Sequence, residues 1–475
     1  MEEAIKILLQ KIPRSVSYPY LKDYQDPYDL LIKILKEQLY TIKNYLNHIP
    51  QNIIFPLLEK LVVDFDFTVR EAVAELLASF PSERTFSLLE NLSTKPNDYV
   101  RLAVALSLAS FPPEKALPLL EKLSTDNYWA VRCAVAHSLA SFPPEKTFPL
   151  LRKLSKDRKS DVRRTVAESL ASFPTKTALP LLEKLSTDRD SSVRRAVARS
   201  LASFPSEVAI PLLQKLTTDP NEYVRSTVVE TLRSFPPETA LPILEKLSND
   251  LDYNVRRAVA QSLANFPPET ALPLLEKLST DSSDGVRSAV AEILHSFPFE
   301  TALPLLEKLS NDSSDGVRYA VAQSLTSLPS EVAIPLLEKL SNDSEWIVRF
   351  ATTKAFRSFP PETALPILEK LSVDPSYNVR SAVSETLRSF PSETSLPILE
   401  KLSNDRYWQV RRTVAWSIAN YPSEIALPLL EKLSTDSDPS VRCSTAWSLT
   451  SFPPEVAIPL LEKLSTDRHK DVKKT

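Results

Sequence analysis

Few side chains in this sequence have the chemistry for catalysis or metal binding. Cys133 and His137 are four residues apart, so a helix would place them on one face, and Glu168 follows thirty-one residues after His137. A thiolate, an imidazole and a carboxylate could form part of a metal site, or the first two could form a thiolate pair. Three scattered ligands without a fourth are weak grounds for either site. We therefore expect no catalytic residue, no metal site and no cofactor.

Glycine is nearly absent, since Gly285 and Gly316 are the only two in 475 residues. Loops that bind nucleotide phosphates need several glycines close together, so that the backbone can approach the phosphate. The composition therefore excludes nucleotide enzymes of the Rossmann and P-loop types.

The bulk composition favours a protein of the reducing cytoplasm. Cys133 and Cys443 are the only cysteines, which excludes a disulfide framework. The 57 basic and 60 acidic residues give a net charge of −3, so no global field attracts nucleic acid or anionic membrane. The first residues lack the features of a signal peptide, and no apolar run reaches the length of about eighteen residues that a membrane span needs.

One internal repeat runs through nearly the whole chain. A Val-Arg dipeptide recurs every thirty-one residues from Arg70 to Arg442, and all but one of these arginines follow an Asp by six residues. Each period has two segments with the apolar spacing of amphipathic helices, such as VRRAVAQSLANFP (255–267) and ETALPLLEKLSTD (269–281). A Pro closes every second helix. A further Pro, as at Pro118, falls within the first helix, where it must delay the start of that helix or kink it.

Paired short helices stacked in frame predict an all-α fold, an α-solenoid superhelix of about 13 to 14 repeats. The pattern TDxxxxVRRAVAxSLAxFP resembles HEAT repeats, in particular the short HEAT-like repeats of the phycobilin lyase type. The resemblance covers residues 51–475 and implies mainly a scaffold. Ser-Phe-Pro stands where those repeats usually have Leu-Gly.

The two ends of the chain differ from the repeat. Residues 1–50 contain a modified second helix, and we expect them to form an N-terminal helical cap on the array at 51–475. The last repeat is incomplete, because the chain stops at Thr475 soon after its second helix begins. That leaves the apolar face of residues 456–464 without a partner helix, which suggests that the natural protein continues.

The Asp and Arg columns are best interpreted as structural. An Asp before a helix can cap its N–H groups, and the Arg points toward the adjacent repeat, so the pairs should form a ladder along the array. We assign this role to Asp126, Arg132, Asp188, Arg194, Asp281 and Arg287.

The repeats disagree most at positions that a helical wheel places opposite the core of the second helix. This face would be open to a partner along a concave groove. Its predicted contact residues are aromatic in some repeats and basic in others: Arg164, Arg195, Arg199, Arg257, Tyr319, Phe350, Arg412, Trp416 and Trp447. Aromatic and Arg side chains are the types favoured at the centres of protein interfaces.

The favoured function is a non-enzymatic scaffold that binds a protein partner along this groove. One alternative is binding of nucleic acid or an acidic ligand through the basic repeats near residues 145–260. A second alternative, implied by the resemblance alone, is a phycobilin lyase-like subunit that handles a chromophore. Salt separates the first two, because a nucleic-acid complex weakens steeply with ionic strength. The identity of the partner and the oligomeric state stay open.

Overall fold

The computed structural model describes residues 73, 74, 76–78 and 81–474. The predicted cap at 1–50 lies outside these residues. The chain divides into two compact units, residues 1–240 and residues 241–475.

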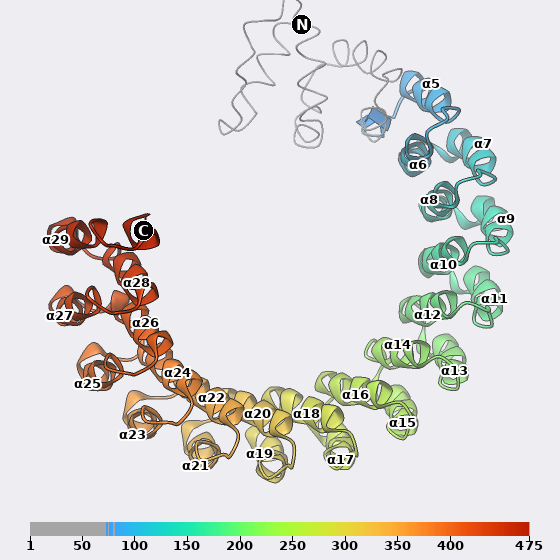
Figure 1. The fold of residues 1–475 in the computed structure, drawn as a ribbon. Helices are drawn as coiled ribbons and strands as arrows, with labels where there is room; N and C mark the ends of the chain where they lie inside the picture. Colours follow the sequence, from blue (N-terminus) through green and yellow to red (C-terminus); the bar gives the residue numbers. More distant parts are fainter. Residues whose placement is uncertain (1–72, 75, 79–80, 475) are drawn as a thin grey trace, which may run out of the picture. The chain divides into compact units, whose positions relative to one another are not determined.

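Helices alternate along the described part of both units, and no strand occurs in it. The odd-numbered helices form one layer of each unit and the even-numbered helices form a second layer (Figure 1). Each odd-numbered helix and the even-numbered helix that follows it correspond to one repeat of the sequence. The predicted all-α solenoid is therefore confirmed.

In the first unit, the odd-numbered layer consists of α5 (Glu83–Leu92), α7 (Pro113–Leu123), α9 (Pro144–Leu154), α11 (Thr175–Leu185) and α13 (Ser206–Leu216). The even-numbered layer consists of α6 (Asp98–Ser107), α8 (Trp129–Leu139), α10 (Ser160–Ser169), α12 (Ser191–Ser200) and α14 (Glu222–Leu232). The boundary between the units falls within α15 (Pro237–Leu247).

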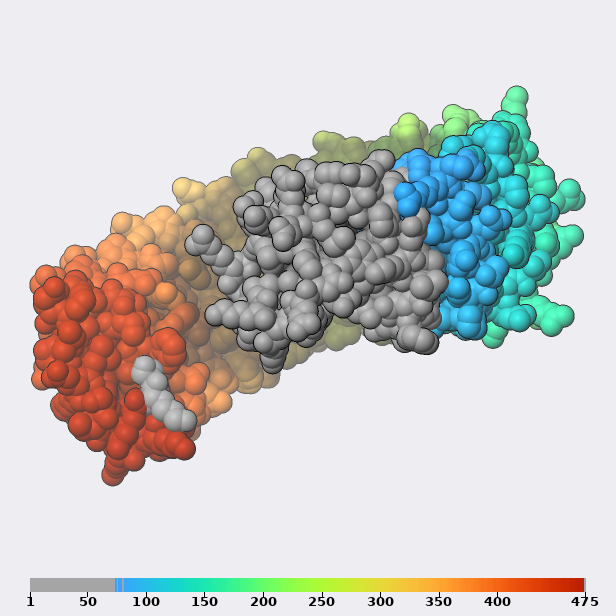
Figure 2. Space-filling view, turned by 90° about the horizontal axis from the view of Figure 1, so that it is seen from above, coloured from blue at the N-terminus to red at the C-terminus, as the bar shows by residue number. Residues whose placement is uncertain are grey.

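In the second unit, the odd-numbered layer continues with α17 (Pro268–Leu278), α19 (Phe299–Leu309), α21 (Ser330–Leu340), α23 (Pro361–Leu371), α25 (Ser392–Leu402), α27 (Ser423–Leu433) and α29 (Pro454–Ser465). The even-numbered layer consists of α16 (Tyr253–Ser262), α18 (Asp284–Ile293), α20 (Asp315–Ser324), α22 (Trp346–Ala355), α24 (Tyr377–Leu387), α26 (Trp408–Ser417), α28 (Pro439–Leu449) and α30 (Lys470–Lys474). The last repeats, orange and red in Figure 2, form a continuous surface.

The Ser-Phe-Pro segment makes the turn between the second helix of one repeat and the first helix of the next repeat. After α6, a 3₁₀ turn, η1 (Leu108–Ser110), leads to Phe111, which is extended and buried. Pro112 follows as the N-cap of α7, with φ −55° and ψ 140°. Because Pro has no N–H and a fixed φ, it ends one helix and pre-sets the backbone for the next.

Pro118 lies inside α7, which begins five residues earlier, at Pro113. Of the two outcomes expected for this Pro, the late helix start is therefore wrong. The ring faces solvent, while Ala116, Leu119, Leu120 and Leu123 are buried on the other side. Packing of that apolar face outweighs the loss of one backbone hydrogen bond.

Successive even-numbered helices pack directly on one another through small side chains. Ser138 Oγ donates a hydrogen bond of 2.8 Å to the Ala105 carbonyl of the preceding repeat, and Ser448 Oγ donates one of 2.8 Å to Ala415. All of these residues are buried. Alanine and serine allow the close approach that brings a side-chain hydroxyl to a neighbouring backbone. Among the described helices, none is long and apolar enough to cross a membrane.

Candidate functional site

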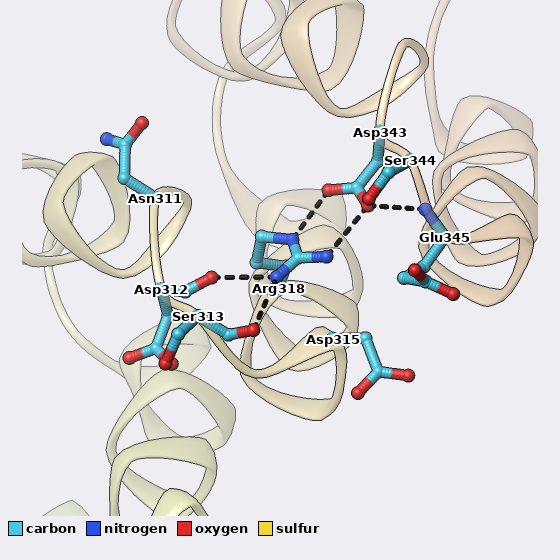
Figure 3. A pocket seen from close by; sticks show the side chains of 8 residues that line it. All are labelled: Asn311, Asp312, Ser313, Asp315, Arg318, Asp343, Ser344 and Glu345. Atoms are coloured by element: carbon cyan, nitrogen blue, oxygen red, sulfur yellow. Dashed lines mark hydrogen bonds and ion pairs between the residues drawn. The ribbon is translucent and has the colours of Figure 1, made fainter.

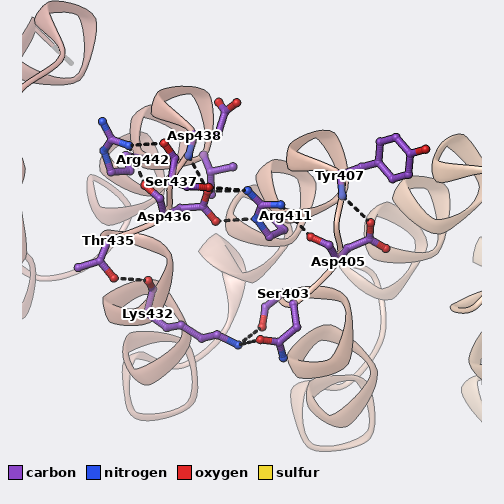
Figure 4. Close-up of polar contacts among 12 residues, drawn as sticks. Ser403, Asp405, Tyr407, Arg411, Lys432, Thr435, Asp436, Ser437, Asp438 and Arg442 are labelled. Atoms are coloured by element: carbon purple, nitrogen blue, oxygen red, sulfur yellow. Dashed lines mark hydrogen bonds and ion pairs between the residues drawn. The ribbon is translucent and has the colours of Figure 1, made fainter.

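The Asp and Arg columns lie in a ladder that joins each repeat to the next (Figures 3 and 4). The Arg318 guanidinium is bidentate to Asp343, with Nε–Oδ2 at 2.6 Å and Nη2–Oδ1 at 2.9 Å. Its Nη1 donates to the backbone carbonyl of Asp312 at 2.7 Å. One side chain therefore ties the loop of its own repeat to the loop of the following repeat.

The six residues assigned to this role in the sequence have the same geometry. Each Arg contacts the backbone carbonyl of the residue six positions before it, which is an Asp in every pair except that of Arg101, and the carboxylate of the Asp twenty-five residues after it. The side-chain pairs that include the six are Arg101–Asp126, Arg132–Asp157, Arg163–Asp188, Arg194–Asp219, Arg256–Asp281 and Arg287–Asp312.

The ladder holds its carboxylates in the charged form. Burial acts to raise the pKa of Asp343, but hydrogen bonds from Arg318 and from the Glu345 N–H outweigh it, so the pKa lies below its usual value. At Asp467 the hydrogen bond from Arg442 dominates and lowers the pKa to about 2. These carboxylates are committed to structure and do not act as catalytic acids.

A second ladder, which the sequence did not reveal, uses the Lys of the first helix. Lys432 Nζ donates to Ser403 Oγ and to Asn404 Oδ1 of the preceding repeat, both at 2.7 Å (Figure 4). Lys277 and Lys308 make the corresponding bond to a Ser. The recurrent Glu-Lys-Leu-Ser was visible in the sequence, but its contact lies twenty-nine residues away, which no local pattern indicates.

The described residues contain no group of three His, Cys, Asp or Glu side chains that could hold a metal ion. Burial raises the pKa of the Cys133 thiol despite its hydrogen bond with Thr165, so this thiol is not poised as a thiolate.

A cavity of about 500 Å³ beside Arg318 is lined by Asp315, Glu345 and residues of the ladder (Figure 3).

The nine predicted contact residues all lie on even-numbered helices, and all are partly or fully exposed. In the first unit, Arg164 lies on α10, and Arg195 and Arg199 lie on α12. In the second unit, the residues are Arg257 on α16, Tyr319 on α20, Phe350 on α22, Arg412 and Trp416 on α26, and Trp447 on α28.

Internal contacts use part of the basic charge in the first unit. Arg164 Nη2 lies 3.3 Å from Asp161 Oδ1 on the same helix. The Arg195 guanidinium lies 5.9 Å from the centre of the Tyr223 ring, and its Nε donates to Thr227 Oγ1 at 3.4 Å. Arg199 is exposed. Arg164 is therefore partly neutralised, whereas Arg195 and Arg199 keep their charge.

In the second unit, a recess of about 280 Å³ opens between α20 and α22. Tyr319, Gln323, Phe350 and Lys354 are among the residues that line it. Gln323 Nε2 lies 3.2 Å from the Tyr319 hydroxyl, and Lys354 Nζ lies 5.8 Å from the centre of the Phe350 ring. Lys354 also pairs with Glu385 on α24. The recess is therefore lined by both aromatic and polar side chains, with one cation among them.

The surface from α24 to α28 presents tryptophans stacked with arginines. The Arg388 guanidinium carbon lies 4.1 Å from the centre of the Trp416 ring, and that of Arg412 lies 5.3 Å from the centre of the Trp408 ring. Trp416 is 49% exposed and Trp447 is 64% exposed. Large exposed aromatic side chains of this kind mark contact surfaces.

Sequence reasoning missed one row of this surface. Trp346, Tyr377 and Trp408 begin α22, α24 and α26, four residues before the column that contains Phe350 and Arg412. Residues four apart on a helix share a face. The helical wheel could have found this row, had it been extended by one turn toward the N-terminus of the helix.

Comparison with known proteins gives one family. A model of HEAT repeats matches overlapping segments that together run from residue 54 to residue 475. A search of curated proteins gives no match.

Similar solved structures include the karyopherin Kap121p and the Kap95:Nup1 complex. The karyopherin Kap121p, bound to the extreme C-terminus of the protein phosphatase Cdc14p, has a TM-score of 0.57 and 15% identity; the alignment covers 90% of this chain and 56% of Kap121p. The Kap95:Nup1 complex has a TM-score of 0.53 and 13% identity, with 94% and 74% of the two chains covered. This chain therefore spans little more than half of Kap121p, and the likeness concerns the fold.

The match of the family model agrees with the repeat period, the paired helices and the ladders between repeats. It does not support the narrower resemblance to repeats of the phycobilin lyase type. The chain belongs to the HEAT-repeat family.

Proposed function

We propose that this protein is a non-enzymatic scaffold of the cytoplasm, and that it binds a protein partner on the even-numbered helices of its second unit. The observation that carries the proposal is the pair Trp416 and Trp447, which are large, exposed and on neighbouring helices. Aromatic side chains at such positions contribute most of the binding energy in protein interfaces.

The solved structures of similar fold support a protein partner. They include a complex of Kap121p with the C-terminus of a phosphatase and a complex of Kap95 with Nup1. Their low identity transfers no partner to this chain. They do provide examples of stacked helical repeats in complex with proteins.

Removal of both tryptophans tests the proposal. The Trp416→Ala/Trp447→Ala variant should lose capture of its protein partner from a lysate of the source cells, measured by affinity purification and mass spectrometry. The matched control is Leu251→Ala/Val373→Ala, which removes two exposed apolar side chains from loops of the same unit. Unchanged capture by the tryptophan variant, with an unaltered circular dichroism spectrum, would show that the surface is not the interface.

Nuclease treatment tests the nucleic-acid alternative in the same experiment. Proteins that are captured through nucleic acid should be lost after treatment and should elute with salt. A partner that binds the tryptophans directly should resist nuclease treatment, because none of its contacts pass through nucleic acid.

A further inference from the structure

Four neighbouring helices of the second unit, α22, α24, α26 and α28, present one surface that we name the aromatic face. Residues four apart on a helix share a face, so the side chains of this surface lie in rows that cross the four helices. The rings are Trp346 and Phe350 on α22, Tyr377 on α24, Trp408 and Trp416 on α26, and Trp447 on α28. Trp346 contacts Phe350 edge-on, with ring centres 6.4 Å apart. The first row of the face thereby joins the recess beside Phe350.

The aromatic face carries an excess of positive charge. It has four cations, Lys354, Arg357, Arg388 and Arg412, and one carboxylate, Glu385, which pairs with Lys354. Within the described residues, none of the three arginines has an ion pair with a carboxylate, whereas the arginines of the ladder do. Their charges are therefore available to a partner.

The stacking of these arginines determines which groups they can bind. A guanidinium that lies over a tryptophan ring keeps its N–H edges free, and those edges fit a carboxylate bidentately. Arg412 over Trp408 provides one such position. Arg388 over Trp416 provides a second on the adjacent helix, where Nη2 donates to Asn420 Oδ1 at 3.4 Å and the Nη1 N–H groups remain for a carboxylate. Exposed rings beside them can bury apolar or proline side chains of the same partner.

We propose that the aromatic face binds an extended acidic segment of a protein, in which carboxylates alternate with apolar or proline side chains. This inference rests on the proposed function and specifies its partner. Packed helices lie about 10 Å apart, and a chain in the polyproline II conformation advances about 3.1 Å per residue with about three residues per turn, so that every third side chain shares one side. The carboxylates that bind Arg388 and Arg412 should therefore be about three residues apart, in a segment of roughly ten residues that crosses the four helices.

The charge of the unit favours a peptide over nucleic acid. Residues 241–475 contain 25 basic and 31 acidic residues, a net charge of −6. A phosphate backbone would be repelled by this charge outside the face, whereas a short segment with two or three carboxylates meets only the local positive charge.

The test uses the full chain and three fluorescent probes of similar length. The first is a peptide of about ten residues with Glu at every third position, between Leu and Pro, a spacing set by the helix separation and the period of polyproline II. The second replaces each Glu by Gln, and the third is oligothymidine. Fluorescence anisotropy should show binding of the Glu peptide and a loss of at least about tenfold in affinity for the Gln peptide, because each lost charge-assisted contact costs about that factor.

The variants locate the binding site. The Arg388→Gln/Arg412→Gln variant should bind the Glu peptide with an affinity at least about tenfold lower, for the same reason. The matched control, Arg152→Gln/Arg158→Gln, removes two exposed arginines from α9 and the loop that follows it in the first unit, and should leave affinity unchanged. Equal binding of the Glu and Gln peptides, equal binding by both Arg variants, or tighter binding of oligothymidine than of the Glu peptide would each overturn the inference.

Failure of this inference can be distinguished from failure of the proposed function. If Trp416→Ala/Trp447→Ala loses its captured partner while the Glu peptide does not bind, the acidic segment is wrong and the protein interface stands. If the tryptophan variant keeps its partner, the interface itself is wrong.

Discussion

Arg318 connects two repeats through one guanidinium. It neutralises Asp343 of the next repeat and satisfies a backbone carbonyl of its own repeat. Both charged side chains are largely buried, with 12% and 8% of their surfaces exposed. The effect of such a pair on stability is largest when one partner is removed, because the remaining buried charge has lost its counter-ion.

Arg318→Ala should therefore destabilise the protein by about 3 kcal/mol, since Asp343 is left buried without its cation. Urea unfolding followed by circular dichroism measures this change. Arg357→Ala is the control, because Arg357 is exposed and has no ion pair among the described residues; it should cost less than about 0.5 kcal/mol. An equal, small effect of both substitutions would contradict a structural role for the ladder.

The contact between α24 and α26 lacks a hydrogen bond that occurs at six other contacts of the even-numbered layer. At those six contacts a Ser on one helix donates to the backbone carbonyl of an Ala on the preceding helix, as Ser138 does to Ala105. At α24 the Ala is replaced by Ser384, and the hydroxyls of Ser384 and Ser417 are buried with no hydrogen-bond partner in the described structure. This contact should be less stable than its neighbours.

Ser384→Ala should raise the free energy of unfolding by about 1 kcal/mol, because it removes an unsatisfied buried hydroxyl and restores the residue found in other repeats. The control, Ser138→Ala, removes a hydroxyl that is hydrogen-bonded and should lower that free energy by about 1 kcal/mol. Denaturant titrations of the two variants should thus move in opposite directions. Destabilisation by both would show that the Ser384 hydroxyl has a partner after all.

At the scale of elements, the repeat period and apolar spacing predicted the helical pairs, their order and the face that holds the variable residues. Local patterns could not predict contacts that join repeats. The Lys432–Ser403 bond and the Ser138–Ala105 bond depend on how helices stack, which no segment of one repeat specifies. The start of α7 ahead of Pro118 also depends on packing, because the buried leucines hold a helix that local propensity opposes.

At the scale of the whole molecule, the ladder makes the stability of the protein depend on pH, with a loss of stability in acid. The aspartates of the ladder, such as Asp343 and Asp436, have pKa values below their usual range because Arg and backbone N–H groups bind the charged form. A group with a lowered folded-state pKa stabilises the protein above its unfolded-state pKa, near 3.9, and loses that contribution as the pH falls through the folded-state value.

The melting temperature should therefore fall steeply as the pH decreases from about 4 toward 2, because many repeats lose the same contribution together. Thermal melts by circular dichroism across this range measure the effect. In the Arg318→Ala variant the melting temperature should fall slightly less with decreasing pH, since one Arg–Asp pair of the ladder is already lost. A melting temperature that stays constant from pH 5 to 2 would show that the ladder adds no net stability.

The central claim is that the partner binds the even-numbered layer of the second unit, and site-specific photo-crosslinking tests it most directly. A photoreactive amino acid at position 416 or 447 of the full chain, activated in cells, should crosslink a protein partner. The same group at Lys401 on α25 or Glu431 on α27, which are exposed on the odd-numbered layer, should not. Crosslinks from positions 401 and 431, with none from 416 and 447, would contradict the account.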